Sequence, residues 1–172
     1  MKKEETQEIV PFSALIDDPM NYLNRELSML KFQRRVLYEA TNEANPLLER
    51  VRFLGLLGSI LDEFFMVRVG SLTMETQVKK DYFYFENLTP EIQLREIRKE
   101  ALKLIQDAQE CYVETLKPKL SDAGIEIYHY KDLNKAQRAR VDAYFKEVIF
   151  PVLTPLAFDP GHPFPYISNL SF

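Results

Sequence analysis

The chain has 172 residues, enough for one ordinary domain or for a small domain plus a piece of a second. Its 46% hydrophobic and 28% charged residues are typical of a globular protein. Its net charge of -4 gives no overall basic field for nucleic acid or an anionic membrane, so a polyanion would need a local cluster of Lys and Arg. Residues 1–5 are charged without an apolar core behind them, and no apolar run approaches the ~20 residues of a membrane span, so we expect a cytoplasmic protein. The single cysteine, Cys111, excludes an internal disulfide framework and is expected to be a buried free thiol.

The first helix is predicted to begin at Ser28, which fits the N-cap position, and to end near Ala40. Apolar residues recur at helical spacing between these two positions. Residues 1–20 precede it and contain prolines and paired aspartates that break any periodic pattern. We therefore expect a flexible lead-in there.

Two short helices, apolar on nearly every side, are predicted within residues 46–74. Asn45-Pro46 fits the start of the first helix, because Asn caps well and Pro suits the first turn. Gly58-Ser59 is expected to interrupt the pattern. Ser59 and Asp62 then form a short-acid variant of the capping box, so a second helix would start at Ile60.

A long helix is predicted over about residues 90–121, opened by Thr89-Pro90 and ended near Pro118 and Gly124. Residues 75–88 before it are expected to form a loop or short hairpin, whose aromatic run at 82–85 is either a partner surface or packs under the helix. Steps of three and four along the helix predict a packing seam of the coiled-coil kind. The seam residues are Leu94, Ile97, Ala101, Leu104, Ala108, Cys111 and Thr115.

The remainder of the chain mixes predicted strand and helix. Residues 125–130 alternate and are β-prone, so a short strand is expected, followed by a helix over residues 134–149. Residues 166–172 look like the start of another strand, which needs neighbours to pair with. The predicted fold class is therefore mainly α: a small helical bundle with the long antiparallel helix, followed by a partial α+β domain.

Three segments resemble the polyphosphate kinase family. They read YLNRELSMLKF at 22–32, NPLLERVRFL at 45–54 continued by LDEFFMVRV at 61–69, and VLTPLAFDPGHPFP at 152–165. Their order and spacing match the family and cover most of the chain from residue 21 onward.

The resemblance implies a part of a long, multidomain enzyme that moves the terminal phosphate of ATP reversibly onto polyphosphate, through a phosphohistidine and with magnesium. It implies a helical N-terminal domain over residues 21–123, which supports the adenine end of ATP. Residues 124–172 would be the truncated start of a head domain that contributes to dimer contacts. The reactive histidine and the magnesium ligands belong to later domains. We therefore expect no catalytic residue, metal site or tightly bound cofactor here, and a homo-oligomer that meets ATP and polyphosphate through the full enzyme.

Four residues are candidates for nucleotide binding. Ile60 occupies the position where the family usually has an Asn that contacts ATP; its side chain cannot hydrogen-bond to a purine edge but can pack on the face of the base. Arg50, Arg52 and Arg68 either form a phosphate-binding cluster, for which the planar guanidinium is suited, or pair with neighbouring glutamates.

Other polar residues favour structural roles. The adjacent carboxylates of Asp62 and Glu63 would point about 100° apart on a helix, which favours capping of a helix N-terminus over shared catalysis or a magnesium site. Neither His129 nor His162 has the orienting partners that a nucleophilic histidine needs, so both are expected to be structural.

A second hypothesis is a helical interaction module that dimerises without binding nucleotide. Its motivation is the aliphatic Ile60 at the nucleotide position and the small residues Ala101 and Ala108 in the predicted seam, which would allow close approach of a partner helix. The two hypotheses differ in whether ATP binds.

Overall fold

The computed structural model describes residues 21–77, 88–155, 158–161 and 163–170. The chain divides into two compact units, Met1–Glu126 and Ile127–Phe172, which are taken separately below. The predicted lead-in at residues 1–20 and the aromatic run at 82–85 lie outside the described residues.

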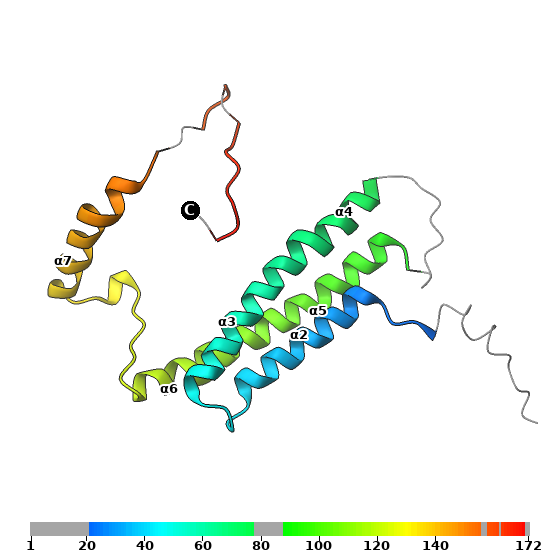
Figure 1. Ribbon diagram of the computed structural model, residues 1–172, viewed down its shortest axis with the longest axis horizontal. Helices are drawn as coiled ribbons and strands as arrows, with labels where there is room; N and C mark the ends of the chain where they lie inside the picture. The colour runs from blue at the N-terminus through cyan, green and yellow to red at the C-terminus, as the bar shows by residue number, and fades with distance from the viewer. Residues whose placement is uncertain (1–20, 78–87, 156–157, 162, 171–172) are drawn as a thin grey trace, which may run out of the picture. The chain divides into compact units, whose positions relative to one another are not determined.

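The first unit is a bundle of three helical arms (Figure 1). The first arm is α2 (Arg25–Thr41). The second arm is α3 (Leu47–Glu63), continued by the π-helical turn η2 (Phe64–Val69) and by α4 (Gly70–Gln77). The third arm is α5 (Pro90–Glu110), continued by the π-helical turn η3 (Cys111–Leu116) and by α6 (Lys117–Asp122).

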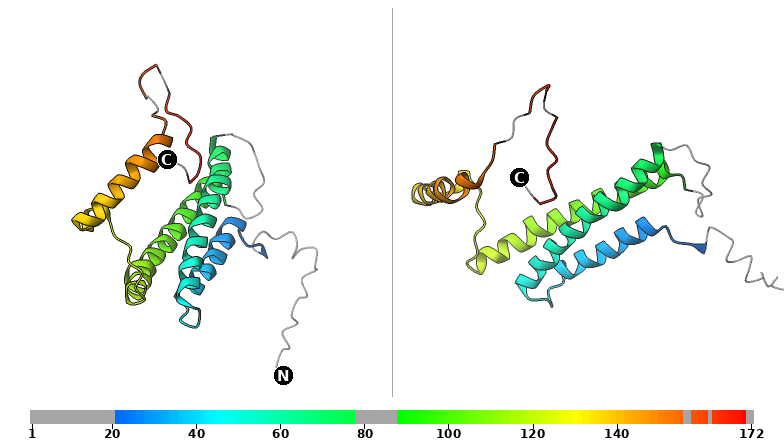
Figure 2. Two further views of the ribbon diagram at one scale, coloured as in Figure 1. Left: turned by 60° about the vertical axis from the view of Figure 1, so that its left-hand side comes forward. Right: turned by 45° about the horizontal axis from the view of Figure 1, so that its top comes forward.

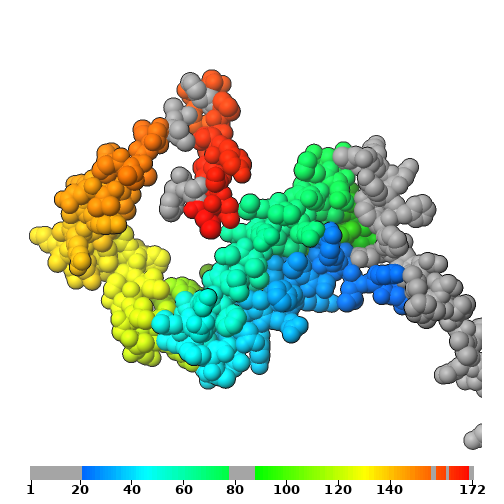
Figure 3. All heavy atoms as spheres, viewed as in Figure 1, coloured from blue at the N-terminus to red at the C-terminus, as the bar shows by residue number. Residues whose placement is uncertain are grey.

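The arms alternate in direction, so that α5 runs antiparallel to α3 and alongside α2 (Figure 2). Side chains of α2 and α3 meet along the length of the two helices (Figure 3). The mainly α fold, with its long helix antiparallel to the arm before it, is thus confirmed. Each arm buries one stripe, because a helix in a small bundle is stabilised chiefly by its apolar face.

The bundle core is formed by residues from all three arms. Its buried hydrophobic members are Leu30, Leu37, Ala40, Leu57, Leu61, Phe64, Leu72, Ile97, Ala101, Leu104, Cys111 and Leu116. The predicted seam of the long helix therefore packs inside this chain, and the prediction that Cys111 is a buried free thiol is confirmed.

The first two helix starts differ from the predicted ones. Helix α2 begins one turn before Ser28, because Asn24 caps it by accepting a hydrogen bond from the Leu27 N–H at 2.9 Å. Asn45 does not cap α3; its side chain instead donates to the backbone and side chain of Glu39. At the long helix the prediction holds, with Thr89 as the N-cap and Pro90 in the first turn.

The predicted break at Gly58-Ser59 is wrong, because α3 runs through it without interruption. The Ser59 hydroxyl bonds back to the Gly55 carbonyl at 3.4 Å, within the same helix, so no capping box forms with Asp62. Glycine inside a helix costs only about 1 kcal/mol relative to Ala, which the packing of Leu57 and Leu61 on either side outweighs.

Both π-helical turns of the bundle coincide with a five-residue step between buried positions. Phe64 is followed by the half-buried Val69 at the end of η2, and Cys111 is followed by the fully buried Leu116 at the end of η3. A regular helix continues a stripe by steps of three or four, and a π turn absorbs one extra residue. The seam prediction is therefore wrong at Thr115, which is half-buried while Leu116 takes the core position.

The long arm ends in a Schellman motif at Gly124. This residue has φ of 80°, a conformation that glycine adopts without steric penalty. The N–H of Ile125 donates to the Leu120 carbonyl at 2.8 Å and the N–H of Gly124 to the Ser121 carbonyl at 2.9 Å. Two carbonyls at the helix end are thereby satisfied.

The second unit contains one long helical segment. The turn η4 (Tyr130–Asp132) precedes α7 (Lys135–Tyr144), which continues through η5 (Phe145–Ile149) into η6 (Phe150–Val152). Asn134 and Gln137 form a capping box at its start, so the predicted helix at 134–149 is confirmed.

The two strands predicted in this part of the chain are wrong. Residues 125–129 have no regular structure, and neither have residues 163–168. Strand backbone is stable only when its N–H and C=O groups pair with a neighbouring strand. In the described part of this unit no residue is assigned to a strand, and β pairing is limited to an isolated bridge at Asp159.

Candidate functional site

The candidate site lies on the flank of α3 and η2, beside their buried stripe. Ile60 is half-buried there and packs against the core. Arg68 is exposed and makes no hydrogen bond or ion pair with the residues that the structure describes. No described residue therefore uses the donors of its guanidinium.

The π turn decides how these two residues lie relative to each other. On a regular α-helix, residues eight positions apart are offset by about 80° around the axis. The extra residue taken up in η2 reduces the offset between Ile60 and Arg68 to about 20°, so both face the same side of the arm. The i–5 hydrogen bond from the Gly70 N–H to the Phe65 carbonyl marks this widened turn.

Gln33 is a residue of this region that the sequence analysis missed. It lies in α2 with only 1% of its surface exposed, and its Nε2 donates to the Ile60 carbonyl at 3.3 Å. A signal existed in the sequence, because Gln33 falls three residues after Leu30 and four before Leu37, in the middle of a core stripe. A polar residue at such a position usually makes a specific hydrogen bond.

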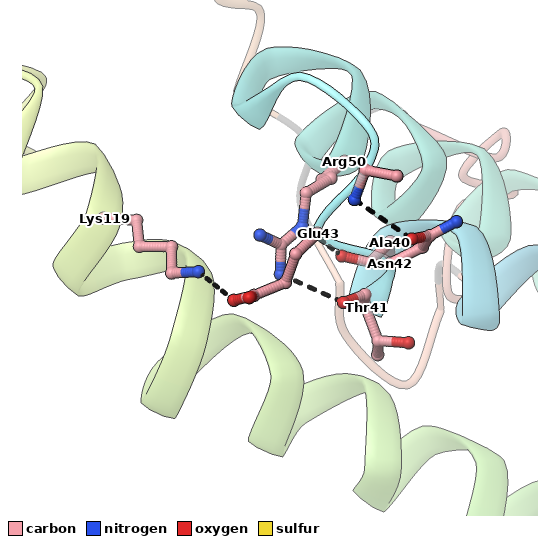
Figure 4. Close-up of polar contacts among 7 residues, drawn as sticks. Ala40, Thr41, Asn42, Glu43, Arg50 and Lys119 are labelled. Atoms are coloured by element: carbon pink, nitrogen blue, oxygen red, sulfur yellow. Dashed lines mark hydrogen bonds and ion pairs between the residues drawn. The ribbon is translucent and has the colours of Figure 1, made fainter.

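Arg50 lies elsewhere, at the other end of α3. The residue is 3% exposed, and its guanidinium donates from Nε to the Ala40 carbonyl at 2.8 Å and from Nη2 to the Thr41 carbonyl at 3.3 Å (Figure 4). Two of its donors are thus occupied by the C-terminal end of α2. These contacts favour a structural role for Arg50, although its predicted part in nucleotide binding stays a prediction.

Next to Arg50, the α2–α3 connection is held to α6 by an ion pair between Glu43 and Lys119 (Figure 4). The hydrogen bond from Lys119, and then its charge and that of Arg50, lower the pKa of Glu43 below its ordinary value. This cluster ties the bundle together at the end remote from η2.

Arg52 is on the outer surface of α3. Its side chain is 80% exposed, and its guanidinium lies 3.7 Å from the Glu49 carboxylate, one turn earlier. The alternative of a pair with a neighbouring glutamate is therefore the one observed for Arg52, in a geometry that contributes little to stability.

The remaining polar candidates are the carboxylates Asp62 and Glu63 and the two histidines. Asp62 and Glu63 are exposed near the C-terminal end of α3, so the expectation that they cap a helix N-terminus is wrong. His129 is exposed at the residue before η4, and His162 lies outside the described residues. Over the described ranges, no group of three or more His, Cys, Asp or Glu side chains converges as metal ligands would.

A groove of about 310 Å³ lies between η2 and the first half of α5. It is almost wholly apolar, and Arg98 is the one charged residue among the described residues that line it. Its lining residues are Phe65, Val69, Leu94, Ile97, Arg98, Ala101, Leu102 and Ile105. Ile60 and Arg68 are not part of this groove.

Known proteins resemble this chain in sequence over nearly its whole length. The polyphosphate kinase N-terminal domain matches residues 22–128, and the polyphosphate kinase middle domain matches residues 136–172. The chain is 45% identical over 164 residues to polyphosphate kinase of Synechocystis sp., and 44% identical over 157 residues to polyphosphate kinase 1 of Chlorobaculum tepidum. These alignments cover 94% and 91% of this chain, but 22% of each relative.

The fold has a counterpart in a crystal structure. Polyphosphate kinase from Porphyromonas gingivalis matches with a TM-score of 0.64 and 26% sequence identity, over 84% of this chain and 20% of that one. The chain therefore belongs to the polyphosphate kinase family, a family of kinases and transferases, and corresponds to its N-terminal region. It spans 22% of the length of the polyphosphate kinases of Synechocystis sp. and Chlorobaculum tepidum.

Two further findings bear on the class of protein. No helix in the described ranges has the length and apolar character needed to cross a membrane. The small-residue seam that motivated the interaction-module hypothesis is buried in the bundle's own core, at Ala101 and its neighbours. That seam is consequently not open to a partner helix, and the family membership does not favour the hypothesis either.

Proposed function

We propose that this chain is the N-terminal region of a polyphosphate kinase and supports the adenine end of ATP during reversible transfer of the terminal phosphate to polyphosphate. One observation carries the proposal: Ile60 and Arg68 share one side of the α3–η2 arm, one presenting an apolar surface and the other a guanidinium that no described residue binds. Eight residues of helix separate them by on the order of 12 Å along the axis, which is comparable to the span from the base to the phosphates of an extended nucleotide.

The two side chains would play different parts. Ile60 packs against the face of the base, and because it has no hydrogen-bonding group it does not distinguish one purine edge from another. Arg68 reaches towards the phosphates, where its planar fork matches phosphate oxygens. The expected binding is therefore weak and tolerant of the base, with ATP and GTP bound about equally well.

The rest of the proposed role follows from the family. Magnesium and the phosphorylated histidine would act through the part of the relatives that this chain does not span, so the chain alone is not catalytic. Polyphosphate would likewise be met through the whole enzyme. We also propose that a second copy of the chain is a partner there, and that the protein works in the cytoplasm.

Calorimetric titration of the 172-residue chain with ATP tests the proposal. Arg68→Ala should weaken binding by roughly tenfold, the order of one charge-assisted hydrogen bond, and Ile60→Asp should weaken it as well, because a charged carboxylate would replace the apolar surface that packs against the base. Arg95→Ala is the matched control, because Arg95 is an exposed arginine on α5 that pairs with Glu96.

Two results would overturn the proposal. One is ATP binding that Arg68→Ala and Arg95→Ala reduce equally, which would indicate a general charge effect. The other is absence of ATP binding at millimolar concentration. Formation of polyphosphate by the chain alone, from ATP and magnesium, would contradict its non-catalytic part.

A further inference from the structure

Gln33 makes a single polar contact inside the bundle. Its side chain is 1% exposed, and its Nε2 donates to the Ile60 carbonyl at 3.3 Å. Its Oε1 has no hydrogen-bond partner among the described residues. All the polar bonding of this buried amide therefore goes to one carbonyl of α3.

The Ile60 carbonyl lies at the point where the regular α-helical hydrogen bonds of α3 end and the π turn η2 begins. The Phe64 N–H already divides its hydrogen bond between the carbonyls of Ile60 and Leu61, and the π turn η2 begins at Phe64. A side chain that donates into the ladder is one of the few local causes of such departures from α-helical geometry. The position of Gln33 therefore accounts for where the turn begins.

Without the π turn, the charged side chain of Arg68 would face the core of the bundle. Arg68 follows Phe64 by four residues and Leu61 by seven, and on an uninterrupted α-helix those spacings put it on the same face as these two buried side chains. In η2 the half-buried Val69 holds that place and Arg68 is exposed. The π turn is thus what brings Arg68 to the flank that carries Ile60.

We propose that Gln33 is a positioning residue: by holding the Ile60 carbonyl it fixes the π turn and keeps Arg68 on the side of Ile60. The effect on the ligand rests on the proposed function. The effect on the register does not, so the two can be measured separately.

The register is measured by the rate at which a thiol reagent modifies Arg68→Cys. The native Cys111 need not be removed, since it is buried and burial raises the pKa of its thiol. Adding Gln33→Met, which replaces the amide by an apolar group of similar volume, should slow modification of the thiol at position 68 by roughly tenfold as it turns towards the core. The thiol of Asp62→Cys, which precedes the π turn, should react at an unchanged rate.

Gln93→Met provides the matched control. Gln93 is a second buried glutamine of the same bundle, but its amide contacts the Leu88 carbonyl and Asn24, neither of which belongs to α3 or η2. It should leave the modification rate at position 68 unchanged. Equal rates with and without Gln33→Met, in chains that unfold cooperatively, would overturn the proposal.

A measurement on the unsubstituted chain tests the proposal even if Gln33→Met does not fold. The Gln33 side-chain amide should exchange slowly with deuterium, because it is buried and hydrogen-bonded. Exchange as fast as that of the exposed Gln77 amide would overturn the proposal.

ATP titration measures the effect of Gln33 on ligand binding. Gln33→Met should weaken ATP binding about as much as Arg68→Ala does. If ATP does not bind the unsubstituted chain while the thiol rates change as expected, the positioning role stands and the proposed function fails.

Discussion

The guanidinium of Arg50 takes the place of the missing backbone donors at the C-terminal end of α2, since its Nε donates to the Ala40 carbonyl at 2.8 Å. Its Nη2 adds a second bond, to the Thr41 carbonyl at 3.3 Å. A cation at this end of a helix also interacts favourably with the helix dipole. Arg50 therefore joins α2 to α3 from inside the bundle.

Replacing Arg50 by Met should lower the free energy of unfolding by about 2–4 kcal/mol, because two carbonyls lose a charged donor inside the bundle. Urea denaturation followed by circular dichroism measures the change. Arg52→Met is the control and should change stability by less than about 0.5 kcal/mol, because Arg52 is exposed and its pair with Glu49 is long. Equal losses for the two variants would contradict the capping role of Arg50.

The ion pair of Glu43 with Lys119 predicts a pH dependence of stability. The hydrogen bond and charge of Lys119 lower the folded-state pKa of Glu43, so the pair stabilises the bundle at neutral pH. That contribution is lost as the pH falls through the lowered pKa. Glu43→Gln should therefore reduce the drop in Tm between about pH 7 and about pH 3.

The salt dependence of Tm tests whether the charge of the Glu43–Lys119 pair causes this effect. Both side chains are at least 40% exposed, so the difference between Glu43→Gln and the unsubstituted chain should shrink in about 1 M NaCl, where the screening length is ~3 Å. Glu126→Gln is a suitable control for loss of an acidic group that has no basic partner among the described residues. A Tm difference that persists at high salt would indicate a cause other than the charge of the pair.

The sequence predicts the helical arms of the bundle well, but it predicts poorly where a helix is interrupted and where a strand forms. The long helix from Pro90 follows from its cap and its seam, because both signals are local and agree. Gly58-Ser59 misled the prediction, since the helix propensity of two residues is weaker than the packing of a whole stripe. Strand predictions at 125–130 and 166–172 failed because pairing partners are not a local property.

The candidate site was partly accessible from the sequence. Ile60 and Arg68 were named, but a regular helix would have put them on different sides, and only the π turn brings them together. The five-residue gap between Phe64 and Val69 carried that information in the apolar pattern. The contact of Gln33 with Ile60 joins two helices, so no local pattern could have shown it.

The five-residue step at η3 gives a direct test of the register. Leu116 is fully buried, whereas Thr115, where a regular seam would continue, is half-buried. Leu116→Ala should cost about 2–5 kcal/mol in unfolding free energy, and Thr115→Ala less than about 1 kcal/mol. Urea denaturation of the two variants measures both values. The reverse order would show that the seam continues in regular steps and that no extra residue is absorbed.

Two glycines should respond to the same substitution with opposite signs. Gly124 has φ of 80° and open space where a Cβ would be, so Gly124→Ala meets no neighbour and its cost comes from the left-handed backbone, about 1–2 kcal/mol. Gly58 lies inside α3, also with open space around a Cβ, so Gly58→Ala should stabilise by about 0.5–1 kcal/mol. Thermal unfolding by calorimetry compares the pair. Destabilisation by Gly58→Ala would indicate a break in α3, and a neutral Gly124→Ala would indicate that the arm does not end in the Schellman turn.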